Sequence, residues 1–333
     1  MLLEPPGPLE VDDLDWGELR LAAQRGGAVV RLADRLTQVA GDEPIPSRFT
    51  EAAAAACATA QHVVEIAGRL SARCNELGLG HAFLRTLDAY PDAPPTIELL
   101  VGHPKSDIDA RMFADLPAVR RRAFAHHWIA NVTSYTAAYG TRIFVRHGRL
   151  GRLGEHARFA RLLLTRALPG TFGATRCAVP SRADHLLLLA MHQLYTRPAF
   201  RLSDLYGAIE AIRTGQIDWD YVYGTALSLG IVPAVGSYLH YADRMHLAAT
   251  QRPLLPVELL TRFEAAPDDM ISESAYFPRL QAAGRLYLQH LRWTLESGRW
   301  HSAARLSLLP LLAVLRAGGT PLPRTANQGG GRK

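Results

Sequence analysis

Residues 84–103 read LRTLDAYPDAPPTIELLVGH, and this stretch decides the fold. Tyr90-Pro91-Asp92 is typical of a turn, because proline and aspartate both favour turn geometry. The segment 95–102 is short, rich in apolar residues and bounded by Pro and Gly, which predicts a strand. Residues 81–87 have the same texture, so an α/β segment is expected to begin here.

Helical patterns flank this segment on both sides. The alanine-rich run 47–77 repeats apolar residues every three or four positions, as a helix does. Further elements are expected to be helices at 16–39, 107–126 and 154–167, and strands at 141–147 and 171–179. The expected division is a helical region (1–79), an α/β core (80–180), a helical domain (181–317) and a disordered tail (318–333).

Composition limits the classes of function. The 333 residues are 48% hydrophobic and carry 37 basic against 31 acidic residues, a net charge of +6. The charges are spread along the chain, so nucleic-acid binding is not expected, and a small molecule or peptide is the expected partner. Nearly all basic residues are arginine, which suggests a GC-rich genome. Lys105 is the one lysine before Lys333.

The cysteines and the apolar runs indicate a compartment. Cys57, Cys74 and Cys177 are isolated thiols without a CxxC pair, which argues against a disulfide framework and a zinc site. The acidic, proline-rich start does not resemble a signal peptide. The apolar run 303–315 is shorter than the roughly 20 residues of a membrane span. A cytoplasmic location is therefore expected, and the sequence does not indicate an oligomeric state.

Several motifs in order resemble a bacterial nucleotidyltransferase-like family over about residues 16–245. Family members read LKG, then Tyr-Pro-Asp, then a strand DIDLLV; the corresponding residues here are 84–86, 90–92 and 96–101. Downstream, VPSRADHLLLLAMHQL resembles the family's helix that ends in a histidine, here His192. RLSDLYGAIEAI resembles the family's aspartate-bearing helix, and IDWD at 217–220 resembles the start of its next helix. The resemblance implies a small mixed sheet embedded in a predominantly helical α/β protein.

The family's metal chemistry needs acidic oxygens, which are largely replaced here. Mg²⁺ takes hard oxygen ligands, and two acids at alternate strand positions share one face. In this chain that pair becomes Thr96 and Glu98, and Val145 stands where the resemblance places a third acid. Thr86 replaces the glycine that lets backbone approach phosphate. No cofactor is therefore expected; the alternative is Mg²⁺ with a nucleoside triphosphate.

A second acidic triplet offers that alternative metal site. Asp107 and Asp109 follow the strand, and with Glu98 they would supply three carboxylates. Against this, the two aspartates open a predicted helix, where positions i and i+2 diverge and an aspartate usually caps orphan amides. Lys105 beside them could anchor a phosphate or could be a solvated loop charge.

Bases and cations surround the same region. Histidine is the usual proton shuttle near neutral pH, so a site without metal could still perform acid–base chemistry. Strand alternation places Arg142 and Arg146 on one face and His147 with the apolar residues on the other, where a structural histidine is an equal alternative. Catalytic candidates are Glu98, His147, His103 and Asp109; ligand-binding candidates are Arg85, Thr86, Thr96, Lys105, Asp107, Arg142, Arg146 and His192.

Three functions remain open from the sequence. The first is a repurposed family member that binds or transforms a small molecule or peptide in a cleft between the sheet and the helices after Ser181. Relatives of this kind often accompany natural-product and peptide-tailoring genes, as the resemblance implies. The second is an active Mg²⁺-dependent nucleotidyltransferase that uses Glu98 with Asp107 or Asp109. The third is a scaffold or regulatory protein without catalysis.

Overall fold

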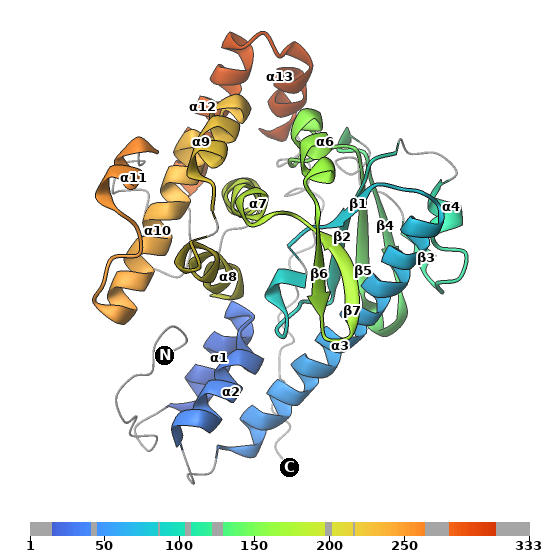
Figure 1. Cartoon of the computed structure of the whole chain (residues 1–333), viewed down its shortest axis with the longest axis vertical. Helices are drawn as coiled ribbons and strands as arrows, with labels where there is room; N and C mark the ends of the chain where they lie inside the picture. Colours follow the sequence, from blue (N-terminus) through green and yellow to red (C-terminus); the bar gives the residue numbers. More distant parts are fainter. Residues whose placement is uncertain are drawn as a thin grey trace, which may run out of the picture.

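The computed structural model combines a small mixed β-sheet with a larger number of helices (Figure 1), which confirms the expected mixed α/β class. It describes residues 15–40, 45–85, 87–103, 108–121, 129–196, 202–215, 217–263 and 280–310. None of the helices in this described part is both long and apolar enough to cross a membrane.

Five of the described strands form one sheet, in the order β1-β2-β5-β4-β3. Only β2 and β5 run parallel, with Glu98 opposite Phe144; the other neighbours are antiparallel. The strand bounds are β1 His81–Phe83, β2 Thr96–Val101, β3 Val119–Arg120, β4 Val132–Thr136 and β5 Arg142–His147. The expected strands at 95–102 and 141–147 are thus confirmed within a residue.

The alternation of these strands gives the sheet two different faces. Ile97, Leu99, Ile143 and Val145 are fully buried in a cluster shared with α3 (Ser47–Glu76). The opposite face carries Glu98 and its neighbours and is turned toward the C-terminal helices. This division follows from the two-residue period of a strand.

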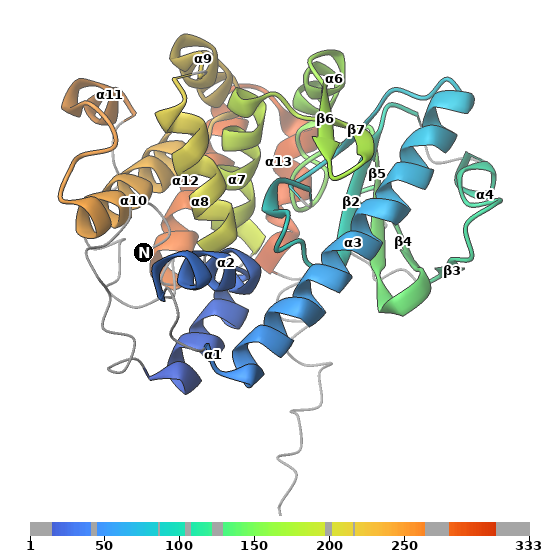
Figure 2. The same ribbon diagram turned by 60° about the horizontal axis from the view of Figure 1, so that its bottom comes forward.

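The N-terminal region contains two helices where one was expected. The helix predicted at 16–39 is interrupted at Gly27, which adopts φ 61 and caps α1 (Trp16–Gly26) before α2 (Val29–Ala40) begins. A residue in the left-handed conformation ends a helix because it turns the chain, so that its own N–H and the next N–H donate to carbonyls of the last helical turn. The long helix expected at 47–77 is confirmed as α3, which runs diagonally across one face of the sheet (Figure 2).

The Tyr-Pro-Asp turn connects the sheet to these helices. The Asp92 carboxylate accepts hydrogen bonds from the backbone N–H groups of Val30 (2.6 Å) and Arg31 (3.2 Å) in the first turn of α2. The Arg31 guanidinium in turn donates to the carbonyls of Ala89 and Tyr90. A carboxylate at a helix N-terminus satisfies orphan amides, so Asp92 has a structural role.

The helix predicted at 107–126 is wrong in its described part. Only α4 (Ile108–Met112) is helical, and Val119–Arg120 forms the edge strand β3. Pro117 explains the break, because a residue before proline is disfavoured in the helical region. Strand β4 was not predicted, although VTSYT is rich in the β-branched and aromatic residues of strands.

The single strand expected at 171–179 is part of a hairpin over 168–179. β6 (Leu168–Phe172) pairs with β7 (Thr175–Val179) as a separate two-stranded sheet, and Gly173 supplies the turn with φ 59. Positive φ favours glycine at such a turn. The helix before this hairpin is α6 (Ala157–Thr165), shorter than the expected 154–167.

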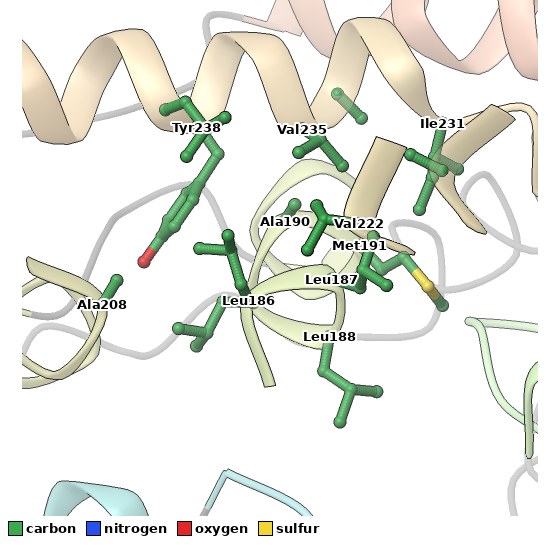
Figure 3. Packing of buried hydrophobic residues seen from close by; sticks show 14 of the residues in the cluster. Leu186, Leu187, Leu188, Ala190, Met191, Ala208, Val222, Ile231, Val235 and Tyr238 are labelled. Atoms are coloured by element: carbon green, nitrogen blue, oxygen red, sulfur yellow. The ribbon is translucent and has the colours of Figure 1, made fainter. Parts of the chain in front are cut away.

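Beyond residue 181 the described residues are helical, as expected. Helix α7 (Arg182–Thr196) lies between the sheet and the outer helices, and most of its apolar residues are buried (Figures 1 and 3). The remaining helices are α8 Leu202–Arg213, α9 Trp219–Leu229, α10 Val232–Thr250, α11 Val257–Arg262, α12 Leu280–Glu296 and α13 Trp300–Ser307.

Candidate functional site

A pocket lies between the Glu98 face of the sheet and α7. It is partly open to solvent, and its cavity volume is about 30 Å³. The residues that line it come from the end of β1, from β2 and β5, from the loop after β5, and from α7. They are Leu84, Arg85, Glu98, Arg146, Leu150, Gly151, Arg152, Leu188, Met191 and His192.

Two arginines hold the Glu98 carboxylate in this pocket. Glu98 Oε1 accepts a hydrogen bond from Arg85 Nη2 at 2.7 Å, and Oε2 lies 3.6 Å from Arg146 Nε. The three side chains are only 9%, 14% and 16% exposed for Arg85, Glu98 and Arg146. A largely buried carboxylate is stabilised by such charge-assisted partners, and the arginines are stabilised by it.

The backbone around Arg85 is unusual for a residue with a side chain. Arg85 has φ 54, in the left-handed region that glycine adopts freely. Such a conformation costs of order 1 kcal/mol or more and concentrates at functional sites. Leu84 just before it is buried, and its N–H donates to the Glu98 carbonyl, so the sheet fixes where Arg85 begins.

Part of the pocket wall is a repeat of Gly-Arg-Leu. Residues 148–154 read GRLGRLG, and each glycine has positive φ: 63 at Gly148, 91 at Gly151 and 73 at Gly154. Leu150 and Leu153 are buried, and Arg146 Nη1 donates to the Gly151 carbonyl at 3.2 Å. The site candidates chosen from the sequence did not include Arg152, although this triplet repeat after a strand is the signal that could have identified it.

Helix α7 supplies the apolar side of the pocket. Leu188 leaves α7 on the side opposite to Val235 and the other outer-helix residues (Figure 3), and it lines the pocket with Met191 and His192. The helix start is fixed by Asp184, which is fully buried and accepts hydrogen bonds from Ser181 Oγ (2.6 Å) and Tyr221. The predicted ligand-binding residue His192 is thus placed with Arg85, Glu98 and Arg146.

The acid and the histidine predicted beside Glu98 lie on the opposite face of the sheet. Thr133 Oγ1 donates to Asp109 Oδ2 at 2.7 Å and lies 2.7 Å from His147 Nε2, which is 3.4 Å from Asp109 Oδ1. The His147 side chain has no exposed surface. Burial and the Asp109 charge raise the pKa of the neighbouring Tyr135. Glu98 and Asp109 are therefore not brought together.

The other predicted residues fall at the margins or outside the described part. Arg142 is exposed at the start of β5 and makes only a long hydrogen bond, 3.5 Å, to Thr96 Oγ1. His103 is exposed just after β2. Thr96 shares the Glu98 face but does not line the pocket. Three predicted residues lie outside the described residues: Thr86, Lys105 and Asp107.

The charges of the lining residues favour an anion. Among the described lining residues are three arginines and one carboxylate. The next carboxylate, Glu155, is turned to the backbone, where it accepts from the N–H groups of Arg152 and Leu153. Within the described ranges no three His, Cys, Asp or Glu residues are grouped closely enough to hold a metal ion.

Comparison with known proteins adds no assignment. No protein-family model matches the chain, and no curated protein matches it. The resemblance to nucleotidyltransferase-like proteins therefore rests on the motifs in the sequence alone.

Proposed function

We propose that this protein is a diverged nucleotidyltransferase-like protein that uses the pocket between the sheet and α7 to bind a small molecule or peptide. The observation that carries the proposal is the Glu98 carboxylate between Arg85 and Arg146. In the family pattern the strand acid faces a metal ion. Here it faces two guanidinium groups, in a pocket that is partly open to solvent.

The same observation argues against a magnesium site at Glu98. A divalent cation at this carboxylate would stand beside two guanidinium charges, and at short range like charges repel strongly in a partly buried site. Val145, at the position of the family's third acid, pairs with Leu99 and is buried on the other face. Asp109 also lies on that side, so the transferase alternative lacks converging carboxylates among the described residues.

The pocket has the composition of a small-molecule site. Such sites are concave and mostly apolar, with a few polar groups that orient the ligand. Leu84, Leu150, Leu188 and Met191 give the apolar surface, and the arginines give orientation. His192 brings an imidazole, the side chain most often used in proton transfer, so an acid–base step in this pocket would use His192 in place of His147.

The test is a thermal-shift screen of metabolites and short peptides on the full chain. Met191→Trp fills the pocket, and Leu295→Trp, on the exposed surface of α12, is the matched control. Ligands of the pocket will raise the melting temperature of the wild type and the control and will leave Met191→Trp unchanged. Circular dichroism checks that each variant is folded. Equal shifts in all three proteins would overturn the proposal.

Calorimetry distinguishes the transferase alternative. ATP, GTP, CTP and UTP are titrated with and without Mg²⁺ into the wild type and Glu98→Ala. The proposal expects no binding that requires both Mg²⁺ and Glu98. Metal-dependent binding that is lost in Glu98→Ala would establish a nucleotide site and contradict the proposal that Glu98 does not hold a magnesium ion.

A further inference from the structure

We infer that Glu98 is an internal competitor for an anion: the Arg85–Arg146 pair binds a phosphate or carboxylate group of the ligand, which takes the place that the Glu98 carboxylate now holds. The inference rests on the proposed function and adds the ligand's chemical class and its control. The following observations carry it.

The first observation is that the two guanidinium groups converge on one carboxylate. Arg85 Nη2 is 2.7 Å from Oε1 and Arg146 Nε is 3.6 Å from Oε2. Guanidinium groups in this arrangement recognise carboxylate and phosphate oxygens equally well, because both present oxygens that accept paired N–H donors. The position of the Glu98 carboxylate therefore marks an oxyanion site.

The second observation is a third guanidinium group in the same lining. Among the described residues, Arg152 lines the pocket together with Arg85 and Arg146. Several cationic groups around one concave site favour the approach of an anion over that of a neutral ligand.

The third observation is the position of Glu98 itself. It lies in the middle of β2, so its backbone is fixed, while its side chain has rotatable bonds and reaches the pocket edge with 14% exposure. A tethered group competes with an effective concentration of the order of millimolar or more. The wild type should therefore bind simple anions weakly, and removal of the Glu98 charge should strengthen their binding.

The direction of that effect separates this inference from a metal site. If Glu98 held a metal ion for a phosphate-bearing ligand, Glu98→Gln would weaken binding of the ligand. If Glu98 competes with the anion, the same substitution strengthens binding. Glu98→Gln keeps the shape of the side chain and a hydrogen-bonding oxygen, so a large effect reports the charge.

The experiment titrates inorganic phosphate and, separately, acetate into the full chain by calorimetry, without metal. Glu98→Gln is expected to bind one of the two anions about tenfold more tightly than the wild type, which corresponds to about 1.4 kcal/mol. Glu296→Gln, on α12 and 61% exposed, removes the same charge elsewhere and should match the wild type. The double variant Glu98→Gln/Arg146→Met should lose the gain.

The two anions distinguish the chemistry of the ligand. A gain for phosphate alone indicates a phosphate-bearing ligand, and a gain for acetate alone indicates a carboxylate. If Glu98→Gln does not fold, as judged by circular dichroism, Glu98→Asp replaces it. The shorter side chain cannot bridge both arginines at the present distances and should give a smaller gain.

Unchanged or weaker anion binding in a folded Glu98→Gln would overturn the inference. A screen that finds a neutral ligand blocked by Met191→Trp, together with no anion gain, would leave the proposed function standing and remove only the competitor role. Absence of both kinds of binding would overturn the two together.

Discussion

The two faces of the sheet each hold one acid against basic or hydroxyl groups, Glu98 on the pocket side and Asp109 on the α3 side. Glu98 is partly exposed and lies between arginines that line a pocket. Asp109 is fixed by Thr133 and His147 beside the apolar cluster of α3 and α4. Similar side chains therefore line a pocket on one side of the sheet and lie in a packed interior on the other, and what distinguishes them is the open space beside Glu98.

Asp109→Ala should have the largest effect on stability. The substitution leaves the buried Thr133 hydroxyl and His147 imidazole without this acceptor, and breaking such a buried arrangement costs about 4 kcal/mol. Urea unfolding of the full chain measures the loss. Glu98→Ala should lose less, about 2 kcal/mol, because water can reach Arg85 and Arg146 through the open side of the pocket. Equal losses would remove the distinction between the two faces.

The second-largest effect should be a loss of stability at acidic pH, caused by the buried histidines His156 and His290 beside the pocket wall. His156 and His290 stack with ring centroids 5.2 Å apart, and burial lowers their pKa values to about 3 and about 4. The unfolded chain takes up these protons near pH 6.5, so stability falls as the pH drops from about 6.5 toward 4. His290→Phe keeps the aromatic stack and should reduce that fall by roughly 3 kcal/mol.

The measurement is the free energy of unfolding between pH 7.5 and 4.5. Arg299, His156 and Glu155 are the charged groups that influence the pKa of His290. The same pH series on Glu155→Gln therefore measures how strongly the Glu155 charge affects that pKa. A pH profile of His290→Phe that is parallel to the wild type would show that the acid sensitivity arises elsewhere.

Gly151→Ala should have an intermediate effect because the pocket wall depends on its backbone. Gly151 has φ 91, and an added Cβ would lie 2.3 Å from the Glu155 carboxyl carbon. We expect a loss of about 2 kcal/mol from backbone strain and displacement of Glu155. Gly148→Ala is the matched control: its φ is 63, and among the described residues no atom lies within 4 Å of the new Cβ. Equal losses in a thermal melt would mean that φ alone accounts for the effect.

Thr96→Val should have the smallest effect. Thr96 shares a face with Glu98 but receives only a 3.5 Å hydrogen bond from Arg142. Stability should change by less than about 0.5 kcal/mol, and anion binding should be unchanged. A loss of anion binding would show that the binding site reaches the start of β2.

Strand periodicity predicted much of this arrangement. The alternation of 142–147 separates Arg146 from His147, and the structure places them on opposite faces as expected. The positions of β2, β5 and α3 also followed from short bounded apolar runs and from a long alanine-rich pattern. These features depend on local periodicity, which the sequence contains in full.

The remainder depended on contacts between distant segments. Asp109 was expected to cap a helix or bind metal, whereas its described partners are side chains of β4 and β5, and β4 itself was not predicted. Arg152 joined the pocket through three positive-φ glycines that set the course of its loop. The register of β4 has no local signal, because it is fixed by the packed fold. The GRLGRLG repeat marks the loop in the sequence but does not show which pocket that loop lines.

Helix α3 closes a ring of contacts through the molecule. The sheet packs on α3, α3 packs on α2, α2 on α1, α1 on α8, and α8 on α7. Between α2 and α8, the Arg31 guanidinium lies 5.2 Å from the centre of the Tyr206 ring. With its 30 residues α3 is a strut about 45 Å long. These contacts link the sheet to α7 by a second route besides the pocket itself, so a rigid-body separation of the sheet from α7 would also have to break one of them. Small movements of side chains such as Glu98 would open the pocket without that cost.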